Sequence, residues 1–246
     1  METDLRVFAD VKSLTFRAAE AAARTINESV QTNGSFSLVL SGGNTPRTFY
    51  SLLSSQFRDQ IPWTKVHVFW GDERYVPLDD LRSNYRMARE TLLDAVPFPI
   101  ANVHPMPTEL PDPEAAAQEY EKALRRYFSA DWPRFDLVLL GLGEEGHTAS
   151  LFPGSPALEE RRRWVVAVKA PVEPLLRLTL TLSVLTHAAN TYFLVTGTNK
   201  AQALHQVLTE TPDPENYPAA GVRSAPGTVI WWVDQEAAAL VKASAA

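Results

Sequence analysis

Residues 36–50 read FSLVLSGGNTPRTFY, and this stretch decides the fold class of the 246-residue chain. The first six residues form an apolar run of strand length, and a helical pattern follows the turn. The turn contains Gly42 and Gly43, with Thr45 expected as the helix N-cap and Pro46 at the first helical position. A strand that leads into a helix in this way is the repeating unit of α/β folds.

The same unit recurs along the chain, because apolar stretches of strand length alternate with helical patterns. Five further strands are expected in VHVFW (66–70), FDLVLLG (135–141), WVVAV (164–168), NTYFLVTG (190–197) and GTVIWWVD (227–234). Helices are expected over residues 14–30, 45–53, 84–93, 114–127, 199–208 and 235–241. Continuous apolar strands between helices predict an α/β fold with a mostly parallel sheet and helices on both faces. We find no repeat or flexible linker, so residues 1–246 are expected to form a single domain.

Composition excludes several classes of function. The chain has no cysteine, which excludes disulfides, thiolate metal sites and a cysteine nucleophile and favours an intracellular protein. The N-terminal segment METDLRVFADVKSL carries acidic residues where a signal peptide has basic ones, and no apolar run approaches the roughly 20 residues of a membrane span. A formal net charge of −6 argues against a broad nucleic-acid surface. We therefore expect a cytoplasmic protein with neither a membrane nor a nucleic acid as partner.

The glycine turn after the first of these strands has the features of an anion site. In open α/β sheets, ligands bind beyond the carboxyl ends of the strands. Gly42 and Gly43 allow backbone N–H groups to approach a phosphate, and the helix N-terminus adds the positive end of its dipole. The G-x-x-x-x-G-K-[ST] pattern of nucleotide-binding loops is absent. The alternative is an ordinary glycine turn with a helix cap, and we favour phosphate binding.

Charged residues follow the strand VHVFW directly. The segment FWGDERYVPLDDLRSN (69–84) contains Asp72, Glu73 and Arg74. Arg74 can pair with one of the two carboxylates as a structural clamp or reach a phosphate, and the sequence leaves both interpretations open. The Ser-Asn pair that ends the segment is expected to cap the next helix.

The segment GLGEEGH (141–147) matches G-x-G-x-x-G after a strand, as a dinucleotide site requires. We reject that interpretation, because Pro153 and Gly154 would stop the helix within about two turns and the next strand lacks the acidic residue that holds a ribose. The glycines instead allow a sharp turn that directs His147 into a cavity.

His147 is the candidate general base, since imidazole titrates near neutral pH. A single histidine in a loop is more often a capping or surface residue, but Glu144 and Glu145 lie close enough in sequence to orient its ring. The other four histidines show no pairing at ligand spacing, so no metal site is predicted.

Two further cations follow in LLRLTLTLSVL (175–185) and VTGTNKAQAL (195–204). Arg177 precedes an alternation of Leu and Thr, and Lys200 follows a Thr-Gly-Thr-Asn turn at a helix start. Either one alone is most simply a solvated charge. If both face the Gly-Gly turn, they complete a phosphate clamp, with arginine as a fork and lysine as a point charge.

Taken in order, these segments resemble the 6-phosphogluconolactonases, which are lactone hydrolases of the oxidative pentose phosphate pathway. The matching pieces are SGGNTP, GDERYVP followed by SN, GLGEEGHTASLFPG, RLTLTLSVL, TGTNKA and YPAAGVRSAPGTVIWWVDQEAA. Each piece alone is modest, but the ordered set covers nearly the whole chain. The resemblance implies a Rossmann-like fold shared with glucosamine-6-phosphate deaminases and ribose-5-phosphate isomerases, with no organic cofactor and no required metal. We expect a monomer, with a homodimer as the alternative.

The resemblance also implies roles for single residues. His147 would activate water for attack on the carbonyl of a sugar-phosphate lactone, and either Glu145 or Asp72 would orient it; Asp72 lies where the deaminases place a catalytic carboxylate. Arg74 would contact substrate or fix its loop. The residues implied to hold the phosphate are Gly42, Gly43, Asn44, Thr45, Arg177 and Lys200.

Two positions depart from the family pattern, which usually has Asp at Glu145 and Ser at Asn44. The extra methylene of Glu145 could move its carboxylate by about 1 Å, enough to change a rate. The alternative enzyme is an amino-sugar phosphate deaminase or isomerase, but those relatives carry Glu where this chain has Phe152 and tend to lack Arg74. The third hypothesis is a non-catalytic sugar-phosphate sensor. Such sensors normally add a DNA-binding domain, for which a first strand near Leu5 would leave no room.

Overall fold

The structure is a computed structural model. It describes residues 4–208, 211, 213–223 and 227–241. Residues 224–226, in the C-terminal motif quoted above, lie outside the described residues.

Six parallel strands form the central sheet in the order β1-β9-β8-β5-β2-β3. Their bounds are β1 Asp4–Phe8, β2 Phe36–Leu40, β3 Val66–Trp70, β5 Leu137–Leu140, β8 Asn190–Val195 and β9 Thr228–Asp234. Every residue of β2 and of β5 is buried, as expected for strands covered on both faces. The predicted α/β class with a mostly parallel sheet is confirmed.

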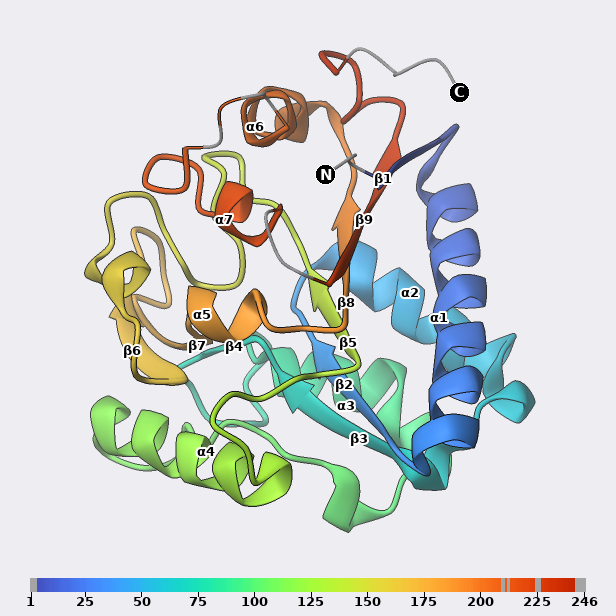
Figure 1. The fold of residues 1–246 in the computed structure, drawn as a ribbon, viewed down its shortest axis with the longest axis vertical. Helices are drawn as coiled ribbons and strands as arrows, with labels where there is room; N and C mark the ends of the chain where they lie inside the picture. The colour runs from blue at the N-terminus through green and yellow to red at the C-terminus, as the bar shows by residue number, and fades with distance from the viewer. Residues whose placement is uncertain (1–3, 209–210, 212, 224–226, 242–246) are drawn as a thin grey trace.

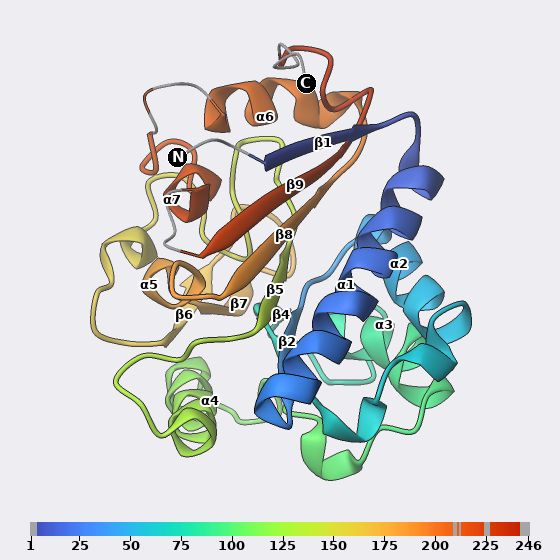
Figure 2. The same cartoon turned by 45° about the vertical axis from the view of Figure 1, so that its right-hand side comes forward.

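Helices α1 (Val11–Asn33) and α2 (Asn44–Ser55) lie on one side of the sheet, to the right in Figures 1 and 2. On the other side lie α4 (Pro113–Phe128), α5 (Leu182–Leu185) and a second, smaller sheet. The remaining helices are α3 (Asn84–Thr91), α6 (Ala201–Val207), α7 (Ala219–Arg223) and the 3-10 turns Arg58–Gln60, Trp63–Lys65, Leu93–Ala95, Ile100–Asn102, Pro156–Glu159 and Thr198–Lys200.

The smaller sheet was not expected. It is antiparallel and has the order β4-β7-β6, with bounds β4 Asp72–Arg74, β6 Val165–Lys169 and β7 Leu176–Leu180. The strand predicted at residues 164–168 therefore does not join the parallel sheet, and the Asp-Glu-Arg segment is a short strand rather than a loop. A backbone hydrogen bond of 2.8 Å from Leu180 to Gly71 ties the two sheets together.

One predicted helix and one predicted helix start are wrong. Residues 235–240 form successive turns rather than a helix, because the Asp234 carboxylate accepts backbone N–H groups of both Ala237 and Gly197 and holds the chain beside the β8 loop. Helix α2 begins one residue before the expected N-cap, with Gly43 as N-cap; Thr45 lies inside the first turn, where its Oγ1 is 2.7 Å from Oγ1 of Thr196.

No helix in the described part of the chain combines the length and the apolar character needed to cross a bilayer.

A pair of histidines on β3 and the following segment should make stability depend on pH. Nδ1 of His67 lies 3.3 Å from Nε2 of His104, whose ring stacks on Phe69. Burial, with a smaller contribution from His67, lowers the pKa of His104 to about 4, and burial also lowers the pKa of His67. The folded state therefore keeps these imidazoles neutral, while the unfolded chain takes up protons below a pH of about 6.5.

Between pH 6.5 and pH 4, we expect the free energy of unfolding of the wild type to fall by roughly 2 kcal/mol more than that of the variant His104→Phe. The measurement is urea unfolding across this range. His104→Phe keeps the stack on Phe69 and removes the titrating ring, so its profile should be flatter. Parallel profiles for the two proteins would contradict this account.

Candidate functional site

The candidate site lies at the carboxyl edge of the sheet, between β2 and β5. The chain continues from β2 to β3 on one side and from β5 to β8 and β9 on the other, so this is the point where the strand order reverses. A cavity of about 310 Å³ opens there. Its lining residues come from the loops after β2, β5 and β8, from β4 and β7, and from the start of α3: Ser41, Gly42, Gly43, Asp72, Arg74, Asn84, Gly141, Leu142, Gly143, His147, Ala149, Arg177 and Lys200. We call it the reaction cavity.

The glycine turn forms one wall of the reaction cavity. Gly43 has φ 111°, in the left-handed region, and is the N-cap of α2 without any side-chain cap. A Cβ on Gly42 would lie 2.0 Å from Oδ1 of Asn84, so only glycine fits. Asn44 and Thr45 face an adjoining cavity of about 420 Å³, which shares Gly42, Gly43, Gly141, Leu142 and Lys200 with the first. The glycine turn thus lies between two neighbouring cavities.

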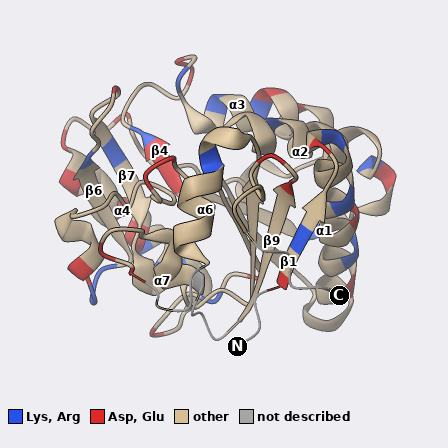
Figure 3. Cartoon of the chain, turned by 90° about the horizontal axis from the view of Figure 1, so that it is seen from above, with Lys and Arg blue, Asp and Glu red and all other residues tan. Residues whose placement is uncertain are grey.

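Three cations meet at the reaction cavity. Arg74 of β4 and Arg177 of β7 are paired directly across the antiparallel ladder, and Lys200 lies after β8. Figure 3 shows β4 and β7 side by side from above. Among the residues that the structure describes, none of the three has a carboxylate partner within ion-pair distance. Like charges placed opposite each other cost stability, so this arrangement suits the binding of an anion.

Arg177 is only 8% exposed, and burial lowers its pKa, while the Asp72 charge acts in the opposite direction. Its Nε donates to the Pro174 carbonyl at 3.0 Å. The Arg74 guanidinium donates to the Arg82 carbonyl at 2.6 Å rather than pairing with Asp72 or Glu73 as a clamp.

His147 lies over the backbone of Gly143, where a Cβ would be 1.9 Å from Nδ1 of the ring. The Gly143 N–H donates to the His147 carbonyl at 2.8 Å and closes the turn. On another side the imidazole packs against Phe152, with ring centroids 4.7 Å apart. The loop therefore fixes the ring from two directions.

Glu145 is the carboxylate next to this ring. Its Oε1 is 3.1 Å from Nδ1 of His147, close enough for an ion pair, although the alignment is not that of a hydrogen bond. Glu144 instead accepts a hydrogen bond of 2.7 Å from Asn199. The extra methylene of Glu145 thus does not prevent contact with His147.

Asp72 is buried on the cavity wall and has different partners. Its Oδ2 accepts from Ser150 Oγ at 2.6 Å, and Asn84 Nδ2 donates to its backbone carbonyl at 2.9 Å and reaches Oδ1 at 3.3 Å. Sequence reasoning missed Ser150 and treated Asn84 only as part of a helix cap. The SN that follows GDERYVP was the available signal for Asn84, while nothing local marked Ser150.

Among the described residues, two buried polar atoms without a hydrogen-bond partner belong to residues that line the reaction cavity, Ser41 Oγ and Arg74 Nε; a third, His147 Nδ1, lies beside Glu145. Such atoms are costly in a protein interior, and their gathering at one cavity indicates a site for a polar ligand. Among the described residues, no group of three or more His, Cys, Asp or Glu side chains could hold a metal ion.

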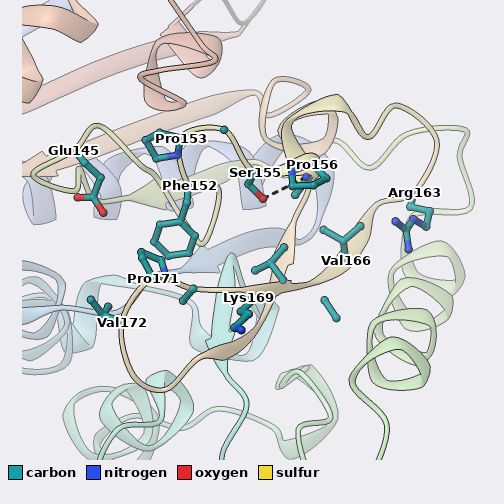
Figure 4. A pocket seen from close by; sticks show the side chains of 15 residues that line it. Glu145, Phe152, Pro153, Ser155, Pro156, Arg163, Val166, Lys169, Pro171 and Val172 are labelled. Atoms are coloured by element: carbon teal, nitrogen blue, oxygen red, sulfur yellow. Dashed lines mark hydrogen bonds between the residues drawn. The ribbon is translucent and has the colours of Figure 1, made fainter.

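A larger pocket of about 940 Å³ adjoins the site but has a different character. Figure 4 shows Glu145 and Phe152 at the end of this pocket opposite Arg163. Most of its lining is apolar, from Pro153, Pro156 and the strand β6 with the residues after it. We take the smaller reaction cavity as the candidate site, because the imidazole and the cations meet there.

Together, the sheet and this cation-lined cavity define a Rossmann-like α/β protein with a site for a small anionic ligand. Comparison with known proteins narrows the class. The profile of the glucosamine-6-phosphate isomerase/6-phosphogluconolactonase family matches residues 9–231, and the chain belongs to this family.

Individual relatives are similar over nearly the full length. A 6-phosphogluconolactonase of Synechocystis sp. is 42% identical, over 96% of this chain and 98% of the relative. The solved structure of a 6-phosphogluconolactonase from Trypanosoma cruzi superposes with a TM-score of 0.87 at 32% identity, covering 98% of this chain and 97% of the other. A monomeric glucosamine-6-phosphate deaminase shares the fold, with a TM-score of 0.81 at 20% identity over 97% of this chain and all of the other. The predicted family and the prediction of an enzyme are confirmed.

Proposed function

We propose that this enzyme hydrolyses 6-phospho-D-glucono-1,5-lactone to 6-phospho-D-gluconate in the oxidative pentose phosphate pathway, as a single domain acting in the cytoplasm. The observation that carries the proposal is that His147 lies in one cavity with three cations that have no carboxylate partner in the described part of the chain. The relatives that are more than 30% identical and are named above are lactonases, which supports a lactone rather than an amino sugar as substrate.

His147 would act through Nε2, since Nδ1 is buried beside Glu145 and Gly143. Glu145 favours the tautomer that carries its proton on Nδ1, which leaves the Nε2 lone pair free. A water molecule gives its proton to Nε2 while its oxygen attacks the lactone carbonyl carbon. When the tetrahedral intermediate collapses, the bond to the ring oxygen breaks, and the imidazolium returns the proton to that oxygen as a hydroxyl.

The phosphate would be held by Arg74, Arg177 and Lys200 together with the glycine turn. N–H groups of Gly42, Gly43, Asn44 and Thr45 lie at or before the first turn of α2, where the helix dipole favours an anion. We assign Asp72, which Ser150 and Asn84 hold in place, to a hydroxyl of the substrate. In this arrangement the phosphate anchor and the base lie on separate walls of the cavity.

The decisive experiment generates the lactone in situ from glucose 6-phosphate and follows 6-phosphogluconate with and without the protein. Equal rates would refute the proposed activity. Release of ammonia from glucosamine 6-phosphate would support the deaminase alternative instead.

Lys200→Met should raise KM for the phosphorylated lactone by about 10- to 100-fold, because a charge-assisted contact of about 1.5–3 kcal/mol is lost. The effect on kcat should be below about threefold, since the anchor contacts substrate and transition state alike. Lys169→Met, on β6 outside the reaction cavity, is the matched control and should leave KM unchanged. Equal KM values for both variants would contradict the assignment of Lys200.

A further inference from the structure

Strand β4 presents its side chains to two different sides. Asp72 and Arg74 line the reaction cavity, whereas Glu73, between them, does not. This is the alternation expected in a strand. Glu73 is nevertheless only 1% exposed, so a carboxylate has been buried directly behind the wall of the site.

The Glu73 carboxylate accepts hydrogen bonds from both ends of the loop that follows β4. Its Oε1 accepts the backbone N–H groups of Arg74 and Asn84, each at 2.7 Å. Its Oε2 accepts the backbone N–H of Tyr85 at 2.7 Å and the hydroxyl of Ser83 at 3.1 Å. One side chain thus closes the loop between β4 and α3 and occupies the N-terminus of α3.

The loop that Glu73 holds also contacts residues of the cavity wall. The loop that Glu73 closes contains Arg82, whose carbonyl accepts the Arg74 guanidinium at 2.6 Å. At the other end, Asn84 carries Nδ2 to the backbone carbonyl of Asp72 and faces Gly42. Moving this loop would therefore displace one cation and one carboxylate of the wall together.

We propose that Glu73 is a positioning residue, which holds Arg74 in the geometry that binds the phosphate of the substrate and, through Asn84, holds Asp72 in the cavity wall. The proposal rests on the proposed function for the nature of the anion only. Burial raises the pKa of Glu73 to about 7. The three backbone donors oppose this shift, because their hydrogen bonds favour the ionised form of the side chain. Four donors need the acceptor capacity of a carboxylate, which an amide cannot supply.

The test is a double-mutant cycle of Glu73→Gln and Arg74→Met. Calorimetry with inorganic phosphate gives Kd, and turnover of the lactone gives KM and kcat. We expect Glu73→Gln to weaken phosphate binding and raise KM by about tenfold each, with kcat changed less than about threefold. In the Arg74→Met background the same change should have little further effect on the Kd for phosphate, because Glu73 acts on the phosphate through Arg74.

Glu121→Gln is the matched control. The Glu121 carboxylate accepts the backbone N–H groups of Trp164 and Val165 and ties α4 to β6, away from the reaction cavity. The Glu121→Gln variant should have a lower free energy of unfolding, with unchanged Kd for phosphate and unchanged KM for the lactone.

The proposal is overturned if Glu73→Gln lowers only the free energy of unfolding, as the control does, or if its effect on Kd adds fully to that of Arg74→Met. A wild-type protein that binds no phosphate would overturn it as well. If the wild type binds phosphate, loses that binding in Glu73→Gln and yet does not hydrolyse the lactone, the proposed function fails and the role of Glu73 stands.

Discussion

Replacing His147 with asparagine is expected to lower kcat by about 10³-fold, within the range that a positioned general base contributes. His147 is the one imidazole that lines the reaction cavity, among the residues that the structure describes. Asparagine keeps a polar side chain of similar reach but cannot accept the proton from water at neutral pH. Because the phosphate anchor lies on other walls, KM should change by less than about threefold.

The measurement is kcat at saturating lactone after subtraction of the hydrolysis that occurs without protein. Glu145→Gln serves as the comparison, since it removes the charge near Nδ1 and leaves the base in place. Its kcat should fall by only about tenfold, as expected for the loss of a partner that orients the base. A His147→Asn variant within threefold of the wild type would exclude His147 as the base.

Much of the parallel sheet could be predicted because its strands are marked locally. FSLVL and VHVFW are short apolar runs bounded by turns, and the structure has strands over nearly the predicted residues. In the smaller sheet, the apolar run WVVAV marked β6, but nothing local marked its pairing or the strand β4. β4 is three charged residues long, and only its pairing with β7, about 100 residues later in the chain, makes it a strand. Pairing at that distance has no local signal in one sequence.

The residues of the candidate site likewise fall into those that the sequence predicted and those that it did not. Gly42 and His147 were found because a strand, a glycine turn and a chemically active residue lie together in sequence. Ser150 and Glu73 were not identified as site residues, because their roles come from contacts with Asp72 and with the start of α3. The sequence left open whether Arg74 pairs with Asp72 or Glu73. Strand alternation turns Glu73 to the opposite side, and Asp72, on the same side as Arg74, has Ser150 and Asn84 as its partners instead.

Adding one methyl group at Gly143 should also lower kcat, although less than removing the base. A Cβ there would lie 1.9 Å from Nδ1 and 2.3 Å from Cε1 of His147, so the ring must leave its position. Phe152 packs against the imidazole on another side and limits the directions in which it can move. Since a displacement of about 1 Å can cost about 10² in rate, we expect Gly143→Ala to lower kcat by about that factor.

Gly141→Ala is the matched control in the same loop, because nothing lies within 4 Å of the added Cβ. Gly141 lines the reaction cavity as Gly143 does, so the two variants differ in the clash with His147 and not in their place at the cavity. They are compared by kcat at saturating substrate and by the free energy of unfolding. If Gly143 acts only through the ring, the double variant Gly143→Ala with His147→Asn should be no slower than His147→Asn alone. Losses that multiply would mean that Gly143 contributes in some other way, for example through the turn that its N–H closes with the His147 carbonyl.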